Sequence, residues 1–217
     1  MLVLFDLDGT LTDPYVGITR SVAHALDRLS APPLSEQQLR AFIGPPLQDS
    51  FASLGLDSGT VARAIGLYRE RFSEQGLYEN EVYAGIPDAL DALVASGTRM
   101  AVATSKPTTF AERILDHFNL SKYFAAVAGA TLDGSRRNKA DIIAFALTQL
   151  DTEPREARMV GDRAQDVIGA QHHQMLSVGV RWGYAEAGEL EGAGADVIVS
   201  TPEQLVRVLA EDHSHEL

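Results

Sequence analysis

Short apolar runs alternate with longer amphipathic stretches along most of this chain of 217 residues. The apolar runs are residues 2–5, 99–104, 124–128, 158–161, 176–180 and 196–199. Between the later runs, apolar residues recur at helical spacing at about 87–96, 107–118, 137–150, 164–173 and 202–210. Continuous apolar strands separated by helices predict a parallel sheet that is buried on both faces. The pattern therefore favours an α/β fold with a doubly wound parallel sheet and right-handed crossovers.

The first two apolar runs are separated by a segment, residues 14–84, that is far too long for one crossover connection. Apolar residues in this segment recur at helical spacing near both of its ends, and shorter helical stretches at 35–42 and 47–54 lie between prolines. We interpret residues 14–84 as a four-helix insert in an α/β domain made of residues 1–13 and 85–217. The linkers near 13–17 and 82–87 are the expected hinges between the two domains.

Composition narrows the possible partners. The chain contains no cysteine, which excludes disulfides, thiolate metal sites and a cysteine nucleophile. The net charge is −12 and no run of Lys and Arg is present, so we expect neither nucleic acid nor an anionic membrane as a partner. No apolar run approaches the roughly 18 residues of a membrane span, and a cytoplasmic location is expected. The polar tail with His213 and His215 is predicted to be disordered.

Polar side chains gather where the predicted strands end. Asp6 and Asp8 follow the first strand, Thr104 to Lys106 end the second, and Asp162 with Asp166 follow the strand at 158–161. Lys139 opens the helix that precedes this last strand. Ligands of parallel sheets bind beyond the carboxyl ends of the strands, so these side chains are expected to converge. Clustered acids need a cation, and a set of oxygen ligands favours a hard ion such as Mg²⁺.

The sequence of residues 6–13, DLDGTLTD, resembles the first motif of the haloacid dehalogenase-like superfamily. The other three motifs follow in order, at Thr104, at Lys139 and at residues 161–166, GDRAQD. The resemblance covers essentially the whole chain, because the helical insert lies where this family places its cap domain. It implies a Rossmann-like core. The branch that the chain resembles most is that of the phosphoglycolate phosphatases, with Ser105 where Asn is usual.

The resemblance implies a mechanism residue by residue. Asp6 attacks phosphorus and becomes an aspartyl-phosphate, while Asp8 protonates the leaving oxygen and later activates water. Thr104 binds phosphoryl oxygens and Lys139 offsets their charge. Mg²⁺ is held by Asp6, by the main-chain carbonyl of Asp8 and by Asp162, and Asp166 acts on the waters of the metal or orients its neighbours.

The same resemblance limits the reaction. Haloacid dehalogenases lack an acid at the position of Asp8, which this chain has. Phosphonatases need a lysine in the cap, and residues 14–84 contain no lysine. Sugar-phosphate mutases carry basic groups in the cap loop, whereas residues 44–49, GPPLQD, are apolar and acidic. These observations favour hydrolysis of a small phosphorylated metabolite, first phosphoglycolate and next a nucleoside 5′-monophosphate.

Several residues are candidates for substrate binding. They are Ser105 and Lys106 beside the second motif, Gly44 and Pro45 in the cap loop, and the cap arginines Arg20, Arg69 and Arg71, which could pair with a substrate carboxylate. A phosphotransfer or signalling protein is the alternative from another class, although receiver domains lack both the insert and the second acid. The oligomeric state is left open between a monomer and a homodimer.

Overall fold

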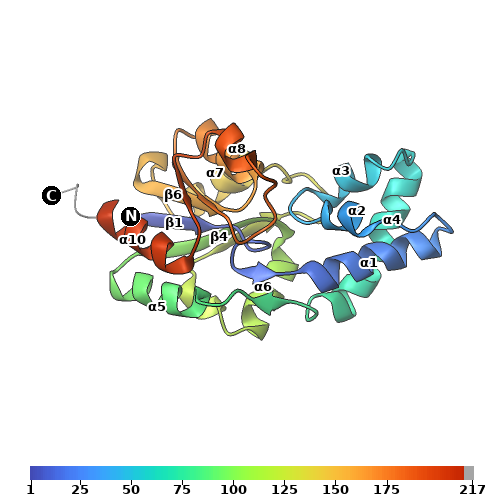
Figure 1. Cartoon of the computed structure of the whole chain (residues 1–217), viewed down its shortest axis with the longest axis horizontal. Helices are drawn as coiled ribbons and strands as arrows, with labels where there is room; N and C mark the ends of the chain where they lie inside the picture. The colour runs from blue at the N-terminus through green and yellow to red at the C-terminus, as the bar shows by residue number, and fades with distance from the viewer. Residues whose placement is uncertain (213–217) are drawn as a thin grey trace. The chain divides into compact units, whose positions relative to one another are not determined.

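The structure, a computed structural model, describes residues 1–212, so the predicted disorder of the tail with His213 and His215 lies outside the described residues. The chain folds into two compact units (Figure 1). The α/β unit comprises Met1–Thr12 and the chain from Val82 onward, and the helical unit comprises Asp13–Glu81. The sequence prediction places these boundaries after residues 13 and 84.

The α/β unit contains a six-stranded parallel sheet, which confirms the predicted fold class. The strand order is β5-β4-β1-β6-β7-β8, so the first strand lies at the centre of the sheet. The strands are β1 (Leu2–Phe5), β4 (Arg99–Pro107), β5 (Val127–Ala130), β6 (Ala157–Gly161), β7 (Leu176–Val180) and β8 (Val197–Val199). A central strand must be apolar on both sides, and all four residues of β1 are buried.

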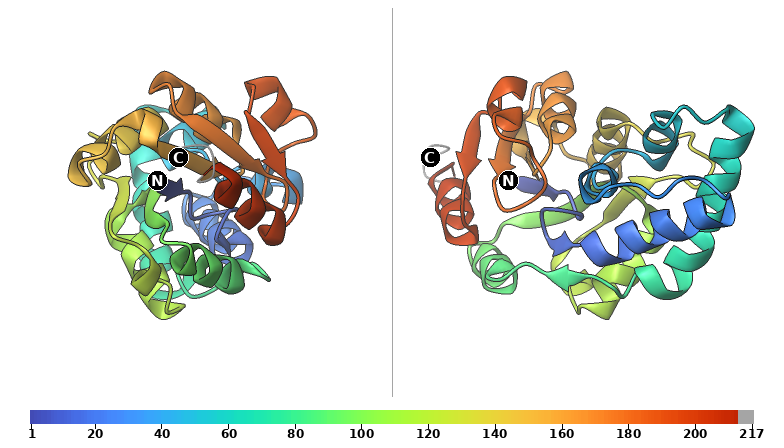
Figure 2. Two further views of the ribbon diagram at one scale, coloured as in Figure 1. Left: turned by 90° about the vertical axis from the view of Figure 1, so that its left-hand side faces the viewer. Right: turned by 45° about the vertical axis from the view of Figure 1, so that its right-hand side comes forward.

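Helices cover both faces of this sheet (Figures 1 and 2). One face carries α7 (Lys139–Gln149) and α8 (Ala164–His172), and the other carries α5 (Ile86–Ala95), α6 (Thr108–His117) and α10 (Pro202–Asp212). The short helix α9 (Glu189–Ala193) packs against α8. Under α7, the strands present small residues, Ala101 and Ala103 of β4 among them, against Ile142 and Ile143. Small side chains let the helix approach the sheet closely, which brings its first residue near the strand ends.

Two strands differ by more than one residue from the predicted apolar runs. β4 extends to Pro107 instead of ending at residue 104, and its pairing with β5 shifts register between Thr104 and Pro107. β5 begins at Val127, whereas the apolar run begins at residue 124. The N–H of Ala125 donates to the carbonyl of Met100 at 2.8 Å, so the chain already lies along β4 before regular pairing starts. The apolar run therefore includes the approach to the strand as well as the strand itself.

The helical unit contains the predicted helices α1 (Tyr15–Arg28), α2 (Glu36–Arg40), α3 (Leu47–Ala52) and α4 (Ser58–Arg71). α4 runs on into a π-helical turn, η1 (Phe72–Gly76). Local capping explains where two of the helices begin. Ser35 and Gln38 form a reciprocal capping box at α2, and the Asp57 side chain accepts the N–H groups of residues 59 and 60 at α4. Buried aromatic residues, including the edge-to-face pair of Phe42 and Phe51, fill the interior of the unit.

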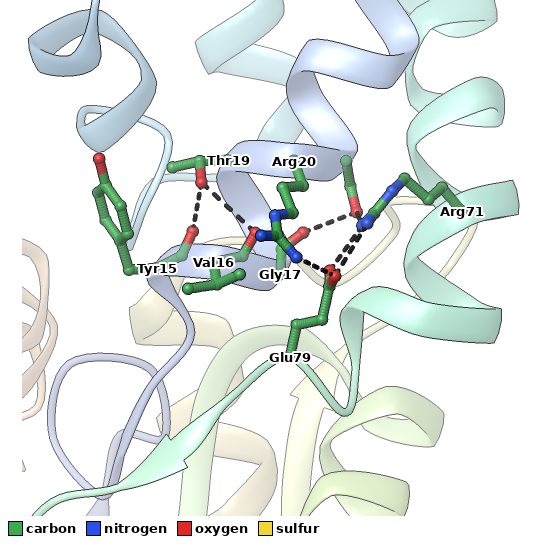
Figure 3. A network of polar contacts seen from close by, with 8 residues as sticks. Tyr15, Val16, Gly17, Thr19, Arg20, Arg71 and Glu79 are labelled. Atoms are coloured by element: carbon green, nitrogen blue, oxygen red, sulfur yellow. Dashed lines mark hydrogen bonds and ion pairs between the residues drawn. The ribbon is translucent and has the colours of Figure 1, made fainter.

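A polar network within the helical unit joins α1, the end of α4 and the segment that leads out of the unit (Figure 3). Its centre is the carboxylate of Glu79. Arg71 contacts both oxygens of this carboxylate, at 2.8 and 3.0 Å, and Arg20 contacts one oxygen at 2.7 Å. Arg71 also donates to the Ser21 hydroxyl at 3.2 Å. Arg20 and Arg71 therefore form ion pairs with Glu79 inside this unit. From the sequence, they were candidates to bind a carboxylate of the substrate.

The connections between the units contain two short strands, β2 (Thr12–Asp13) and β3 (Glu81–Val82), which pair with each other. Among the described residues, no helix combines the length and the apolar character needed to cross a membrane.

Candidate active site

The predicted site residues of the α/β unit meet at the carboxyl edge of the sheet. Asp6 and Asp8 directly follow β1, Thr104 and Lys106 belong to the last part of β4, and Lys139 is the first residue of α7. Asp162 and Asp166 lie after β6 and in the first turn of α8, respectively. All seven side chains are buried. The site is thus assembled from three neighbouring strands and two helix starts.

Three carboxylates of this set form one cluster. Asp6, Asp162 and Asp166 each offer an oxygen atom, and these atoms lie within 4.8 Å of one another. Main-chain N–H groups hold each side chain in place, from Leu7 to Asp6 at 2.8 Å, from Tyr184 to Asp162 at 2.7 Å and from Arg163 to Asp166 at 3.1 Å. A backbone group therefore helps to orient each of the three carboxylates.

Burial and repulsion by neighbouring acids disfavour the charged state of Asp162 and Asp166. Burial, followed by the charges of Asp166 and Asp6, raises the pKa of Asp162 well above its ordinary value of 3.8. Burial also raises the pKa of Asp166, to about 6, although the charge of Lys139 opposes the change. A bound cation would relieve the same repulsion and restore the ionised form. The cluster thus has the electrostatic properties of a cation site.

Lys139 ties the cluster to the sheet. Its ammonium lies 2.7 Å from Asp166, 3.1 Å from Asp6 and 3.0 Å from the carbonyl oxygen of Ala103 in β4. Burial by itself lowers the pKa of Lys139, but the carboxylates of Asp166 and Asp6 outweigh it and the pKa is raised. Lys139 is therefore a fixed positive charge next to the carboxylate of Asp6.

Asp8 is not one of the three clustered acids and pairs with a different lysine. One of its oxygens lies 2.7 Å from the ammonium of Lys106, and both side chains are buried. Burial raises the pKa of Asp8, while Lys106 acts in the opposite direction. The two acids of the first motif thus have separate lysine partners, Asp6 with Lys139 and Asp8 with Lys106.

The remaining predicted residues divide between the units. Thr104 is buried at the end of β4, and its hydroxyl accepts a hydrogen bond from the N–H of Lys106 at 3.2 Å. Ser105, the residue between Thr104 and Lys106 in the sequence, is partly exposed. Gly44 and Pro45 belong to the helical unit, where they precede α3. Pro45 borders a hollow of about 400 Å³ within that unit, which Phe42 and residues of α3 also line.

A further loop contributes to the site; from the sequence, its position after a strand end suggested that it borders the site, but a packing role was preferred. Residues 182–184, Trp-Gly-Tyr, follow the end of β7. The main-chain N–H of Tyr184 donates a hydrogen bond to Asp162, and the indole N–H of Trp182 donates one to the carbonyl of Thr10 at 3.0 Å. A Cβ atom on Gly183 would lie 2.3 Å from the carbonyl oxygen of Gly9 and 2.4 Å from Asp162. The position of this loop, after another strand end on the same edge, is the signal that pointed to the site.

The side chain of Arg163 pairs with an acid of α9. Its guanidinium lies 2.9 Å from Glu189 of α9, and the same carboxylate accepts the N–H of Ala164 at 2.8 Å. Glu189 thereby satisfies the start of α8 and anchors the turn that carries Asp162. Arg163 is thus part of the support of the site.

The donor set fits a hard divalent cation. All available ligand atoms in the cluster are carboxylate oxygens, which Mg²⁺ prefers. If all groups are ionised, four carboxylates and two ammonium groups leave two negative charges in the buried site. A divalent ion balances this charge.

Comparison with known proteins places the chain in a family. A sequence model of the haloacid dehalogenase-like hydrolases matches residues 3–180. The chain therefore belongs to this family, and the membership and phosphatase class predicted from its motifs are confirmed.

Individual relatives are similar over most of their length. A 5′-nucleotidase of Pseudomonas aeruginosa is 44% identical over 189 residues, which are 87% of this chain and 86% of the relative. The tyrosine-protein kinase PtkA of Mycobacterium tuberculosis is 42% identical over 197 residues, 91% of this chain and 67% of the relative. The crystal structure of a predicted phosphatase from Clostridium acetobutylicum is 43% identical, covers 97% of this chain and 98% of its own, and superposes with a TM-score of 0.93.

Proposed function

We propose that the chain is a Mg²⁺-dependent phosphomonoesterase that forms an aspartyl-phosphate on Asp6. The observation that carries this proposal is the separate placement of the two acids after β1. Asp6 lies in the acidic cluster beside Lys139, and Asp8 lies outside it on Lys106. This separation supports nucleophilic attack by Asp6 and proton transfer by Asp8.

The chemistry takes two steps. In the first, a carboxylate oxygen of Asp6 bonds to phosphorus, the bond from phosphorus to the ester oxygen breaks, and that oxygen takes a proton from Asp8. In the second, a water oxygen bonds to phosphorus, the water proton returns to Asp8, and the bond between Asp6 and phosphorus breaks. Atoms and charge balance, and both aspartates return to their starting state.

The protein supplies charge and orientation for both steps. Lys139 offsets the charge of the phosphoryl oxygens, and the Thr104 hydroxyl binds one of them. Asp6, Asp162 and Asp166 would hold Mg²⁺ directly or through its waters. When bound, the ion supplies Lewis-acid stabilisation of the phosphoryl group.

For the substrate, we propose a nucleoside 5′-monophosphate ahead of phosphoglycolate, which reverses the order expected from the sequence. A relative named 5′-nucleotidase is 44% identical, whereas relatives named phosphoglycolate phosphatase from Vibrio parahaemolyticus and Pseudomonas aeruginosa are 25% and 31% identical. The paired cap arginines also favour this order. Arg20 and Arg71 are engaged by Glu79, so they do not offer a ready partner for the carboxylate of phosphoglycolate.

The test is phosphate release from nucleoside monophosphates, phosphoglycolate and sugar phosphates, each assayed with Mg²⁺, with EDTA and with Asp6→Asn. We expect metal-dependent turnover that Asp6→Asn reduces by at least about 10³-fold, because the nucleophile is lost. Lys122→Met is a matched control, since Lys122 is exposed. Turnover that survives Asp6→Asn would disprove the assignment of the nucleophile.

A second candidate is phosphoryl transfer to or from a protein tyrosine, and the similarity to PtkA favours it. The same aspartyl-phosphate would then exchange with a phenolic oxygen. Incubation with a tyrosine peptide and radiolabelled ATP, and separately with a phosphotyrosine peptide, tests this candidate. Label transfer that depends on Asp6 would support it, and phosphate release from mononucleotides alone would exclude it.

A further inference from the structure

The ion pair between Lys106 and Asp8 is the part of the site that the cation cluster does not explain. The ammonium of Lys106 lies 2.7 Å from Oδ2 of Asp8. The Lys106 side chain is 4% exposed and that of Asp8 is 11% exposed. A lysine is seldom buried unless it has a specific partner, so this pair is a built feature of the sheet edge.

The other oxygen of Asp8 is in a different state. Oδ1 is buried and has no hydrogen-bond partner among the described residues. An unpaired buried carboxylate oxygen is costly, and it is tolerated where a site needs it for a ligand. Lys106 thus fixes one oxygen of Asp8 and leaves the other available to accept or donate a proton.

The backbone of β4 places Lys106 for this contact. The strand shifts register between Thr104 and Pro107, within the segment that carries Lys106. The N–H of Lys106 donates to the Thr104 hydroxyl, which orients the turn of the chain at this point. Across this irregular segment the Lys106 ammonium reaches Asp8, while the Thr104 hydroxyl holds the backbone of Lys106.

From this geometry we propose that Lys106 is a positioning residue that holds Asp8 so that Oδ1 meets the leaving-group oxygen. The proposal rests on the proposed phosphatase function. Lys106 then supports proton transfer by Asp8, in place of the substrate-binding role predicted from the sequence. Lys139 serves Asp6 in the nucleophilic part of the reaction, and Lys106 serves Asp8 in the acid–base part.

A positioning role for Asp8 makes the contribution of Lys106 depend on the leaving group. Ethoxide and other alkoxides are poor leaving groups, so an alkyl ester needs a proton on the departing oxygen as its bond to phosphorus breaks. The 4-nitrophenolate ion leaves without one. A misplaced acid therefore slows the hydrolysis of ethyl phosphate much more than that of 4-nitrophenyl phosphate.

The experiment measures kcat/KM for ethyl phosphate, phenyl phosphate and 4-nitrophenyl phosphate, because this constant reports the step in which the leaving group departs. The variants are Lys106→Met, Lys106→Arg, Asp8→Asn and the double variant Asp8→Asn with Lys106→Met. Lys122→Met is the matched control for removal of a lysine charge. The ratio between two substrates is taken from one enzyme sample, so partial unfolding of a variant does not change it.

We expect Lys106→Met to lose about 100-fold on ethyl phosphate and less than about 5-fold on 4-nitrophenyl phosphate, with phenyl phosphate between them. Lys106→Arg should recover part of the loss. The double variant should be no slower on ethyl phosphate than Asp8→Asn, because both changes remove the same proton transfer.

An equal loss on all three substrates, or a loss in the double variant that exceeds that of Asp8→Asn, would overturn the proposal and assign Lys106 to the substrate. Failure of the underlying function gives a different result. The wild-type protein would then release no phosphate from any ester, or Asp6→Asn would remain active.

Discussion

Two clusters of carboxylates and cations, one in each unit of this protein, use the same groups in opposite ways. In the α/β unit, four buried acids face two buried lysines, which leaves an excess of negative charge. In the helical unit, the single carboxylate of Glu79 faces two arginines, and its surroundings are partly exposed. Solvent screens the second cluster and not the first.

The difference separates a binding site from a structural contact. The Glu79 cluster is satisfied by its own groups, and the Arg71 hydrogen bond, opposed by burial and helped by Arg20, lowers the pKa of Glu79. The acids of the α/β unit are not satisfied, because burial raises the pKa values of Asp162 and Asp166. Buried acids that lie this close together and are oriented by backbone N–H groups have the properties of a cation-binding site. The four predictions that follow test this contrast.

The largest effect is expected for Lys139→Met, which keeps the length of the side chain and removes its charge. Lys139 contacts both Asp6 and Asp166, so its loss leaves the acidic cluster without its internal cation. We expect a decrease of about 10³-fold in kcat/KM for the best phosphate ester. Lys122→Met should retain wild-type activity. Similar losses in the two variants would mean that the position of the charge has no role.

Gly183→Ala should weaken metal binding by about 10- to 100-fold, because the added methyl group would displace Asp162. Calorimetric titration with Mg²⁺ measures this directly, without an activity assay. Gly192→Ala is the matched control, since a Cβ atom at Gly192 meets no atom within 4 Å. Unchanged affinity in Gly183→Ala would remove the loop at 182–184 from the support of the site.

The contributions of the two clusters to the stability of the folded state should change with pH in opposite directions. The pKa of Asp166 rises from 3.8 to about 6 on folding, so protonation favours the folded state. This stabilisation, on the order of 3 kcal/mol, is present below pH 3.8 and is lost as the pH rises through about 6. The pKa of Glu79 is lowered instead, so its contribution is present above its ordinary 4.5 and is lost as the pH falls through the folded value.

In EDTA, the melting temperature should therefore rise as the pH falls from 7.5 to 5.5, and Asp166→Asn should flatten this rise. Added Mg²⁺ should stabilise the protein more at pH 7.5 than at pH 5.5, since it binds the ionised acids. A melting temperature that falls over this interval in EDTA, and falls equally in Asp166→Asn, would contradict the assignment.

The smallest effects are expected for the arginines around Glu79. Arg71 is 15% exposed and contacts both carboxylate oxygens, so Arg71→Met should cost about 1 to 2 kcal/mol in the stability of the helical unit. Arg20 is 63% exposed, and Arg20→Met should cost less than about 0.5 kcal/mol. Hydrogen exchange of the α1 and α4 amides in the two variants measures the difference. Equal effects would show that burial does not distinguish the two contacts.

Much of the fold and most of the acidic site could be predicted from local sequence. The apolar runs predicted the strands, because a strand buried on both faces leaves an uninterrupted run of apolar residues. The order of the strands then placed Asp6, Thr104 and Asp162 at one edge, because parallel strands end on the same side. The loop at 182–184 was interpreted as packing, because its contacts with Asp162 come from a main-chain N–H and a glycine, which residue type does not reveal.

The sequence by itself determined the α/β class, the helical insert and the set of acids and lysines available for catalysis. These properties depend on periodicity and on residue type, which are local. Only the tertiary structure decided the pairing, with Lys139 on Asp6 and Asp166, Lys106 on Asp8, and Arg71 and Arg20 on Glu79. A charge interacts with whichever groups the fold brings within a few ångströms, and burial sets the strength of that interaction. Neither the partner of a charge nor the strength of the pair can therefore be obtained from spacing along the chain.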